Sequence, residues 1–105
     1  MANKVIAAVT AQNTWTDSFD PFSLNRSTLA FTCLAGQFNL FIYGTFVATV
    51  TLQKSFDGTT WIAMATTYTA PGAFSFTELE KGVVYRVGVA TGDFTSGTAN
   101  LRLSN

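Results

Sequence analysis

The segment FVATVTLQKSFDGTTWIAMAT, Phe46 to Thr66, decides the fold. Apolar and polar residues alternate on both sides of Asp57-Gly58, and this period of two is typical of strands with one buried face. An Asp-Gly pair between two such runs is the strongest short-range hairpin signal, because both residues tolerate positive φ. The sequence therefore predicts strands over Phe46–Ser55 and Thr60–Thr66, joined by a two-residue type I′ turn.

This turn also predicts which residues face one another across the hairpin. The expected register pairs large residues with small ones: Lys54 with Trp61, Leu52 with Ala63, and Val50 with Ala65. In that register Trp61 covers the aliphatic stem of Lys54, and the apolar face of the first strand continues into the two alanines of the second. We expect this face to belong to the core.

Short alternating blocks recur along the 105 residues, and helical periodicity is absent. Further strands are predicted at Lys4–Thr10, Trp15–Phe19, Leu29–Cys33, Phe38–Tyr43, Ala73–Phe76, Val83–Ala90 and Thr98–Leu103. Seven to nine strands at this spacing predict one all-β domain over residues 1–105, an antiparallel β-sandwich or a small barrel, of which we expect the sandwich. Cys33 falls at an apolar position and is expected to be a buried thiol. Arg86 and Arg102 alternate with core residues and are expected on the exposed face.

Charged residues make up only 11% of the chain, and its net charge is zero, whereas an ordinary domain is about a quarter charged. A surface built from Thr, Ser, Asn and Gln is cheap to desolvate, which favours assembly into a homo-oligomer. The alternative is a monomer whose Thr content reflects strand propensity alone. The charge balance predicts no binding of nucleic acid, and no apolar run is long enough to predict a membrane span.

The chain contains no histidine, which removes the usual activator of serine and cysteine nucleophiles and the commonest metal ligand. The nearest carboxylate pairs are Asp17 with Asp20, in an irregular segment, and Glu78 with Glu80, beside a turn. A glycosidase holds its two carboxyls across a cleft, and neither pair predicts such a cleft. We expect no enzyme activity, no cofactor and no metal site.

Residues 11–27 carry bulky apolar side chains with no regular period. A single sandwich cannot easily bury them all on one face, so they predict either an arm that packs on a neighbouring subunit or a loop folded over its own sheet end. Phe94, in a predicted loop from Gly92 to Gly97, poses the same choice. The candidate interface residues are Trp15, Phe19, Phe22, Leu24 and Phe94.

Two local motifs resemble known structural turns. SFDGTTW, Ser55 to Trp61, is similar to the Asp-box turn of sialidases, one residue shorter between Asp57 and Gly58; that turn is remote from catalysis, so the resemblance implies no activity. LEKGVVYRVGV, Leu79 to Val89, resembles the corner between the fifth and sixth strands of fibronectin type III and immunoglobulin-like domains. It lacks the proline usual at the Lys81 position. The resemblance implies an immunoglobulin-like sandwich in which Tyr85 is structural and its hydroxyl bonds backbone near the turn.

The second half of the chain is similar to a recurring type of small tailed-bacteriophage virion protein, in which a GTV-x-LQ-SFDG-TW hairpin precedes a PG turn, a YR strand and a closing TSGT…RLS strand. The matching residues are Gly44, Thr45, Val50, Leu52, Gln53, Ser55 to Trp61, Pro71, Gly72, Tyr85, Arg86, Thr95 to Thr98 and Arg102 to Ser104. The resemblance implies a structural protein of the virion.

Low charge, abundant Phe and Thr, and the virion resemblance together lead us to expect a capsid decoration or cement protein that binds the major capsid protein or other virion proteins. A tail or head-to-tail connector component is the alternative within this class. A hypothesis from another class is a carbohydrate-binding sandwich, with an exposed aromatic residue as its stacking platform. The candidate platforms are Trp15, Trp61 and Phe94.

Overall fold

The computed structural model describes residues 4–12, 26–28 and 30–105. Within these residues it contains strands and no helix. The strands are β1 (Lys4–Val9), β2 (Phe31–Thr32), β3 (Gly36–Tyr43), β4 (Phe46–Ser55), β5 (Ile62–Tyr68), β6 (Gly72–Glu78), β7 (Val84–Gly97) and β8 (Ala99–Ser104). The predicted strand Trp15–Phe19 lies outside the described residues.

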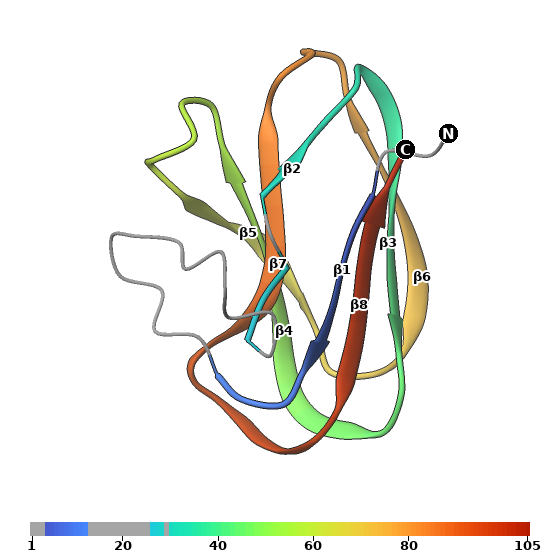
Figure 1. Cartoon of the computed structure of the whole chain (residues 1–105), viewed down its shortest axis with the longest axis vertical. Helices are drawn as coiled ribbons and strands as arrows, with labels where there is room; N and C mark the ends of the chain where they lie inside the picture. Colours follow the sequence, from blue (N-terminus) through green and yellow to red (C-terminus); the bar gives the residue numbers. More distant parts are fainter. Residues whose placement is uncertain (1–3, 13–25, 29) are drawn as a thin grey trace.

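The strands form two antiparallel sheets of four strands each, as Figure 1 shows. The first sheet has the order β1-β8-β3-β6, and the second has the order β2-β7-β4-β5. The predicted all-β antiparallel sandwich is confirmed. Its strand order is that of a jelly roll; immunoglobulin domains share the sandwich architecture but connect their strands differently.

The core lies between the sheets and contains the residues that the alternation placed there. Cys33 is fully buried, as predicted, and burial raises the pKa of its thiol. The predicted core residues of β3, of β7 with the residue before it, and of β8 are all at most 3% exposed: Phe38, Leu40, Ile42, Val83, Tyr85, Val87, Val89, Ala99, Leu101 and Leu103. Removing their apolar surface from water is the main term that holds the two sheets together.

The β4–β5 hairpin exists, but its predicted turn and register are wrong. Lys54 pairs with Ile62 and Gln53 with Ala63, so the connection spans six residues from Phe56 to Trp61. No described residue other than glycine has positive φ, which excludes a type I′ turn at Asp57. A register irregularity follows between Thr51 and Gln53, and the alanines expected in the core, Ala63 and Ala65, are exposed.

Side-chain hydrogen bonds explain the wider turn. The Asp57 carboxylate accepts hydrogen bonds from the backbone N–H groups of Thr59 and Thr60, at 2.8 and 2.7 Å, and from the Ser55 hydroxyl at 3.0 Å. Ser55 Oγ itself accepts a hydrogen bond from Gly58 N at 2.8 Å, which is the fourth bond within this turn. These bonds hold the pKa of Asp57 well below its usual range, the Thr60 and Thr59 amides contributing most. Asp57 and Gly58 are therefore a structural turn, as predicted, although of another type.

β7 is longer than predicted, because the expected loop from Gly92 to Gly97 is part of it. This extension pairs with the start of β4, where Ala48 faces Phe94 and Phe46 faces Gly97, with irregular register on both sides of Ala48. Such bulges let one long strand bend around the end of the sandwich. Phe94 is consequently half-buried and packs against the core of its own chain.

Candidate functional site

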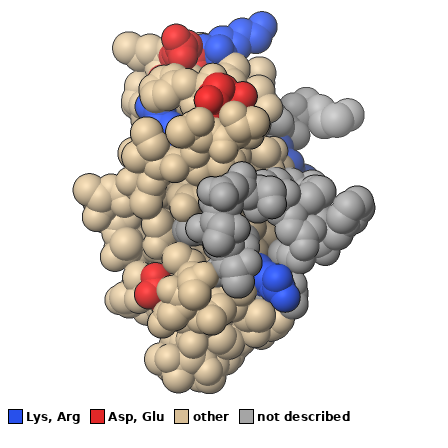
Figure 2. All heavy atoms as spheres, turned by 90° about the vertical axis from the view of Figure 1, so that its left-hand side faces the viewer, with Lys and Arg blue, Asp and Glu red and all other residues tan. Residues whose placement is uncertain are grey.

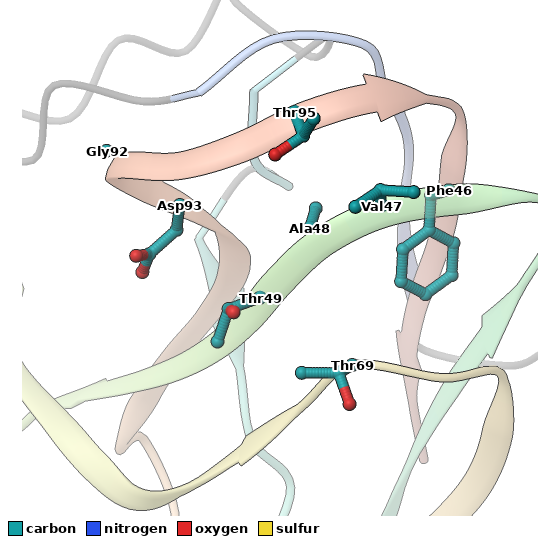
Figure 3. Close-up of a pocket in the computed structure, with 8 residues that line it drawn as sticks. All are labelled: Phe46, Val47, Ala48, Thr49, Thr69, Gly92, Asp93 and Thr95. Carbon is teal, nitrogen blue, oxygen red and sulfur yellow. The ribbon is translucent and has the colours of Figure 1, made fainter.

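A pocket of about 430 Å³ opens where the extension of β7 passes the start of β4 and the turn that follows β5. Its lining residues are Phe46, Val47, Ala48, Thr49, Thr69, Gly92, Asp93 and Thr95. Figure 3 shows the Asp93 carboxylate and the Phe46 ring at opposite ends, with threonine side chains between them. A carboxylate, hydroxyls and an aromatic ring can bind a polyhydroxylated ligand by hydrogen bonds and ring contact.

The same pocket offers few groups for chemistry. Among the described residues that line it, Asp93 is the only ionisable one. Among the described residues no group of three or more His, Cys, Asp or Glu side chains is placed to hold a metal ion.

The outer face of the first sheet, defined by Ile6, Ala8, Phe41, Tyr43, Asn100 and Arg102, is a second candidate surface. Strand register sets Ile6, Arg102 and Phe41 side by side across three strands. Large apolar side chains stay open to solvent on it, Ile6 at 58%, Phe41 at 44% and Tyr43 at 48% exposure. The Phe41 and Tyr43 rings stack with their centroids 4.9 Å apart. Apolar groups gathered on one exposed face are typical of a protein interaction surface.

Tyr85 is structural, but its hydroxyl does not bond backbone. It donates to the Glu78 carboxylate at 2.8 Å, and Glu78 in turn contacts Lys54 Nζ at 2.6 Å and accepts a bond from the Glu80 backbone N–H. The Lys54 ammonium lowers the pKa of Glu78 to about 2, while burial, and next the adjacent carboxylate, raises the pKa of Tyr85. Leu79, expected in the corner, is 83% exposed. The acid side chain thus replaces the backbone carbonyl that the corner motif predicts.

Trp61 contacts Arg86 rather than the stem of Lys54. The predicted exposure of Arg86 is wrong: it is 1% exposed, and burial lowers its pKa to about 10. Its guanidinium lies 4.3 Å from the Trp61 ring centroid, and its Nε donates to Gln53 Oε1 at 2.6 Å. One face of the indole is therefore already occupied, which argues against Trp61 as a free stacking platform.

Other predicted site residues fall in different places. Phe94 lies on β7 close to Asp93 but contributes to the core rather than to the pocket lining. Arg102 is half-buried on the outer face of the first sheet, not fully exposed. The candidate interface residues Trp15, Phe19, Phe22 and Leu24 lie outside the described residues.

Neither candidate surface was predicted from the sequence. The outer face of the first sheet carried a readable signal, because Phe41 and Tyr43 alternate with the core residues of the same strand and must point the opposite way. The pocket carried none. Its lining comes from three segments far apart in the chain, which only the bend of β7 brings together.

No protein-family model matches the sequence, and no curated protein matches it. Among solved structures, the globular domain of zebrafish complement 1qA protein is similar with a TM-score of 0.49 and 16% identity, over 97% of this chain and 94% of that one. Values this low assign neither family nor function. In the described part of the chain, no helix has the length and apolarity needed to span a membrane.

Proposed function

We propose that the protein is a structural component of a bacteriophage particle, specifically a capsid decoration or cement protein that binds the shell as a homo-oligomer. The observation that carries this proposal is the outer face of the first sheet, where the large apolar side chains of Ile6, Phe41 and Tyr43 remain exposed. Covering that face removes apolar surface from water, and each Å² that is buried contributes about 25 cal/mol of favourable free energy. Few ions need to lose their hydration in return.

The rest of the surface supports the same function. Figure 2 shows charged atoms only in small, separate groups among broad uncharged areas on the face that it presents. A low density of charge lowers the desolvation cost of packing against the major capsid protein or other virion proteins. Jelly rolls serve both viral capsid proteins and lectins, so the fold does not choose between assembly and ligand binding.

The experiment starts from purified phage particles analysed by mass spectrometry, where this protein should appear at high copy number. Recombinant protein should then bind particles that lack it and raise their resistance to heat. Phe41→Ser should abolish this binding, whereas Leu79→Ser, which changes a still more exposed apolar residue away from the sheet face, should not. Particles without the protein would refute the proposal. If antibodies against the protein labelled only the tails of the particles, the protein would instead be a tail or head-to-tail connector component.

A second candidate function, binding of a carbohydrate, is favoured by one observation: the pocket joins the Asp93 carboxylate, threonine hydroxyls and the Phe46 ring. A glycan array tests it directly. Binding that is lost in Asp93→Ala and kept in Glu80→Ala would favour a saccharide ligand. An array with no signal would remove this candidate.

A further inference from the structure

The outer face of the first sheet is positively charged at its centre. Arg102 lies between Ile6 and Phe41, and its Nε is buried with no hydrogen-bond partner among the described residues. Lys4 lies exposed near the start of the neighbouring strand. None of the outward positions of the four strands is acidic. A partner that fits this face therefore brings both apolar side chains and a carboxylate.

The chain has six acidic residues, and the structure places four of them elsewhere. Asp57 holds its own turn, and Glu78 bonds Tyr85 and Lys54. Asp93 lines the pocket, and Glu80 lies in the corner beside Glu78. The other two are in the segment NTWTDSFDPFSLN, residues 13–25, which has no basic residue. The bulky apolar residues of this segment are Trp15, Phe19, Phe22 and Leu24.

We propose that residues 13–25 of one copy of the chain dock on the outer face of the first sheet of a second copy, with Asp17 or Asp20 paired to Arg102. The aromatic residues of the segment then cover Ile6, Phe41 and Tyr43. This deepens the proposed function: the face joins the copies, and the homo-oligomer formed in this way is the species that binds the shell. It rests on that function only for the expectation of a homo-oligomer.

Two observations favour a second copy as the source of the segment. The residues that flank it are bonded to β7: Gln12 accepts a hydrogen bond from Gly92 N at 2.7 Å, and the Arg26 carbonyl accepts one from Val89 N at 3.1 Å. Because β7 belongs to the second sheet, the segment of the same chain would have to pass around β1 and return. Two outer faces packed directly together would instead oppose their arginines, and like charges repel.

Sedimentation velocity over a range of concentrations tests the proposal with the full chain. The wild type should associate, and Arg102→Glu should raise the dissociation constant at least about tenfold. Lys81→Glu, the same charge change at an exposed turn, should leave it unchanged. Asp17→Lys with Asp20→Lys should weaken association as Arg102→Glu does, and all three changes together should restore it.

A synthetic peptide of residues 13–25 gives a second measurement that does not depend on the variant chains folding. Added to the wild type, it should compete with self-association and shift the NMR signals of Ile6, Phe41 and Tyr43. A monomeric wild type at all concentrations, an unaffected Arg102→Glu chain, or shifts confined to other residues would overturn the proposal. Self-association through this face by a protein that does not bind particles would leave the inference standing and remove the proposed function.

Discussion

The guanidinium of Arg86 lies over the indole ring of Trp61, with its Cζ 4.3 Å from the ring centroid. This contact joins β7, one of the two central strands of the second sheet, to the end of the β4–β5 loop. Gln53, on β4 beside Arg86, accepts the Nε–H bond. One aromatic face and one amide oxygen thus help to hold the cation in its buried site.

Trp61→Ala should lower the free energy of unfolding by about 2 kcal/mol, because it removes a desolvated cation–π contact and opens a buried guanidinium to water. Urea denaturation followed by circular dichroism measures the change. Phe56→Ala is the matched control in the same loop: Phe56 is 66% exposed and makes only a solvent-exposed cation–π contact with Lys54, so its removal should cost about 0.5 kcal/mol. Equal effects of the two substitutions would contradict this role of Trp61.

Tyr85→Phe should lower the free energy of unfolding by about 1.5 kcal/mol, because the substitution deletes the buried bond to the Glu78 carboxylate and leaves the ring in place. Tyr43→Phe removes a hydroxyl from a ring that is 48% exposed and should have almost no effect. Thermal and urea unfolding of both variants check the difference. A Tyr85→Phe protein as stable as the wild type would show that the hydroxyl contributes nothing.

Stability should fall in acid through Glu78. Its pKa is about 2 in the folded protein, against an ordinary value of 4.5, because Lys54 and Tyr85 stabilise the ionised form. The unfolded chain therefore binds more protons, and the stabilisation is present above about pH 4.5 and is lost as pH falls towards 2. Urea midpoints at pH 6 and pH 3 measure this loss.

Glu78→Gln should reduce the difference between those two midpoints, because the substituted side chain has no proton to gain. Asp57, whose pKa is also lowered, acts in the same direction and accounts for acid sensitivity that remains. Glu80→Gln, in the same corner, should keep the wild-type difference. An undiminished pH dependence in Glu78→Gln would assign it to other carboxylates.

Gly88→Ala should destabilise the protein by about 2 kcal/mol through overpacking. A Cβ at this position would lie 2.4 Å from Ser27 Cβ and 2.6 Å from the Arg26 carbonyl, where residues 26–28 pair with β7 in an antiparallel bridge. Adding Ser27→Gly removes the first of these clashes and should recover part of the loss. Differential scanning calorimetry of the single and double variants checks both results; a stable Gly88→Ala protein would mean that this pairing is not tightly packed.

Regular strands were predicted well, because the alternation of apolar and polar residues indicates which side chains face inward. β4 spans Phe46–Ser55, as predicted, and the inward residues of β3 and β8 are buried. The errors lie where side chains or distant segments decide the backbone. Asp57 widened the hairpin turn by bonding amides further along the chain, and pairing with β4 turned the expected loop around Phe94 into strand.

The sequence alone determined an all-β sandwich, its inward-facing residues and the buried thiol, since alternation and turn residues are local properties of the chain. Only the tertiary structure decided the jelly-roll order, the burial of Arg86 beneath Trp61, the bond from Tyr85 to Glu78, and the two candidate surfaces. These features depend on which distant strands become neighbours. The strand arrangement is stabilised by contacts between residues far apart in the chain, which no local stretch of sequence reveals.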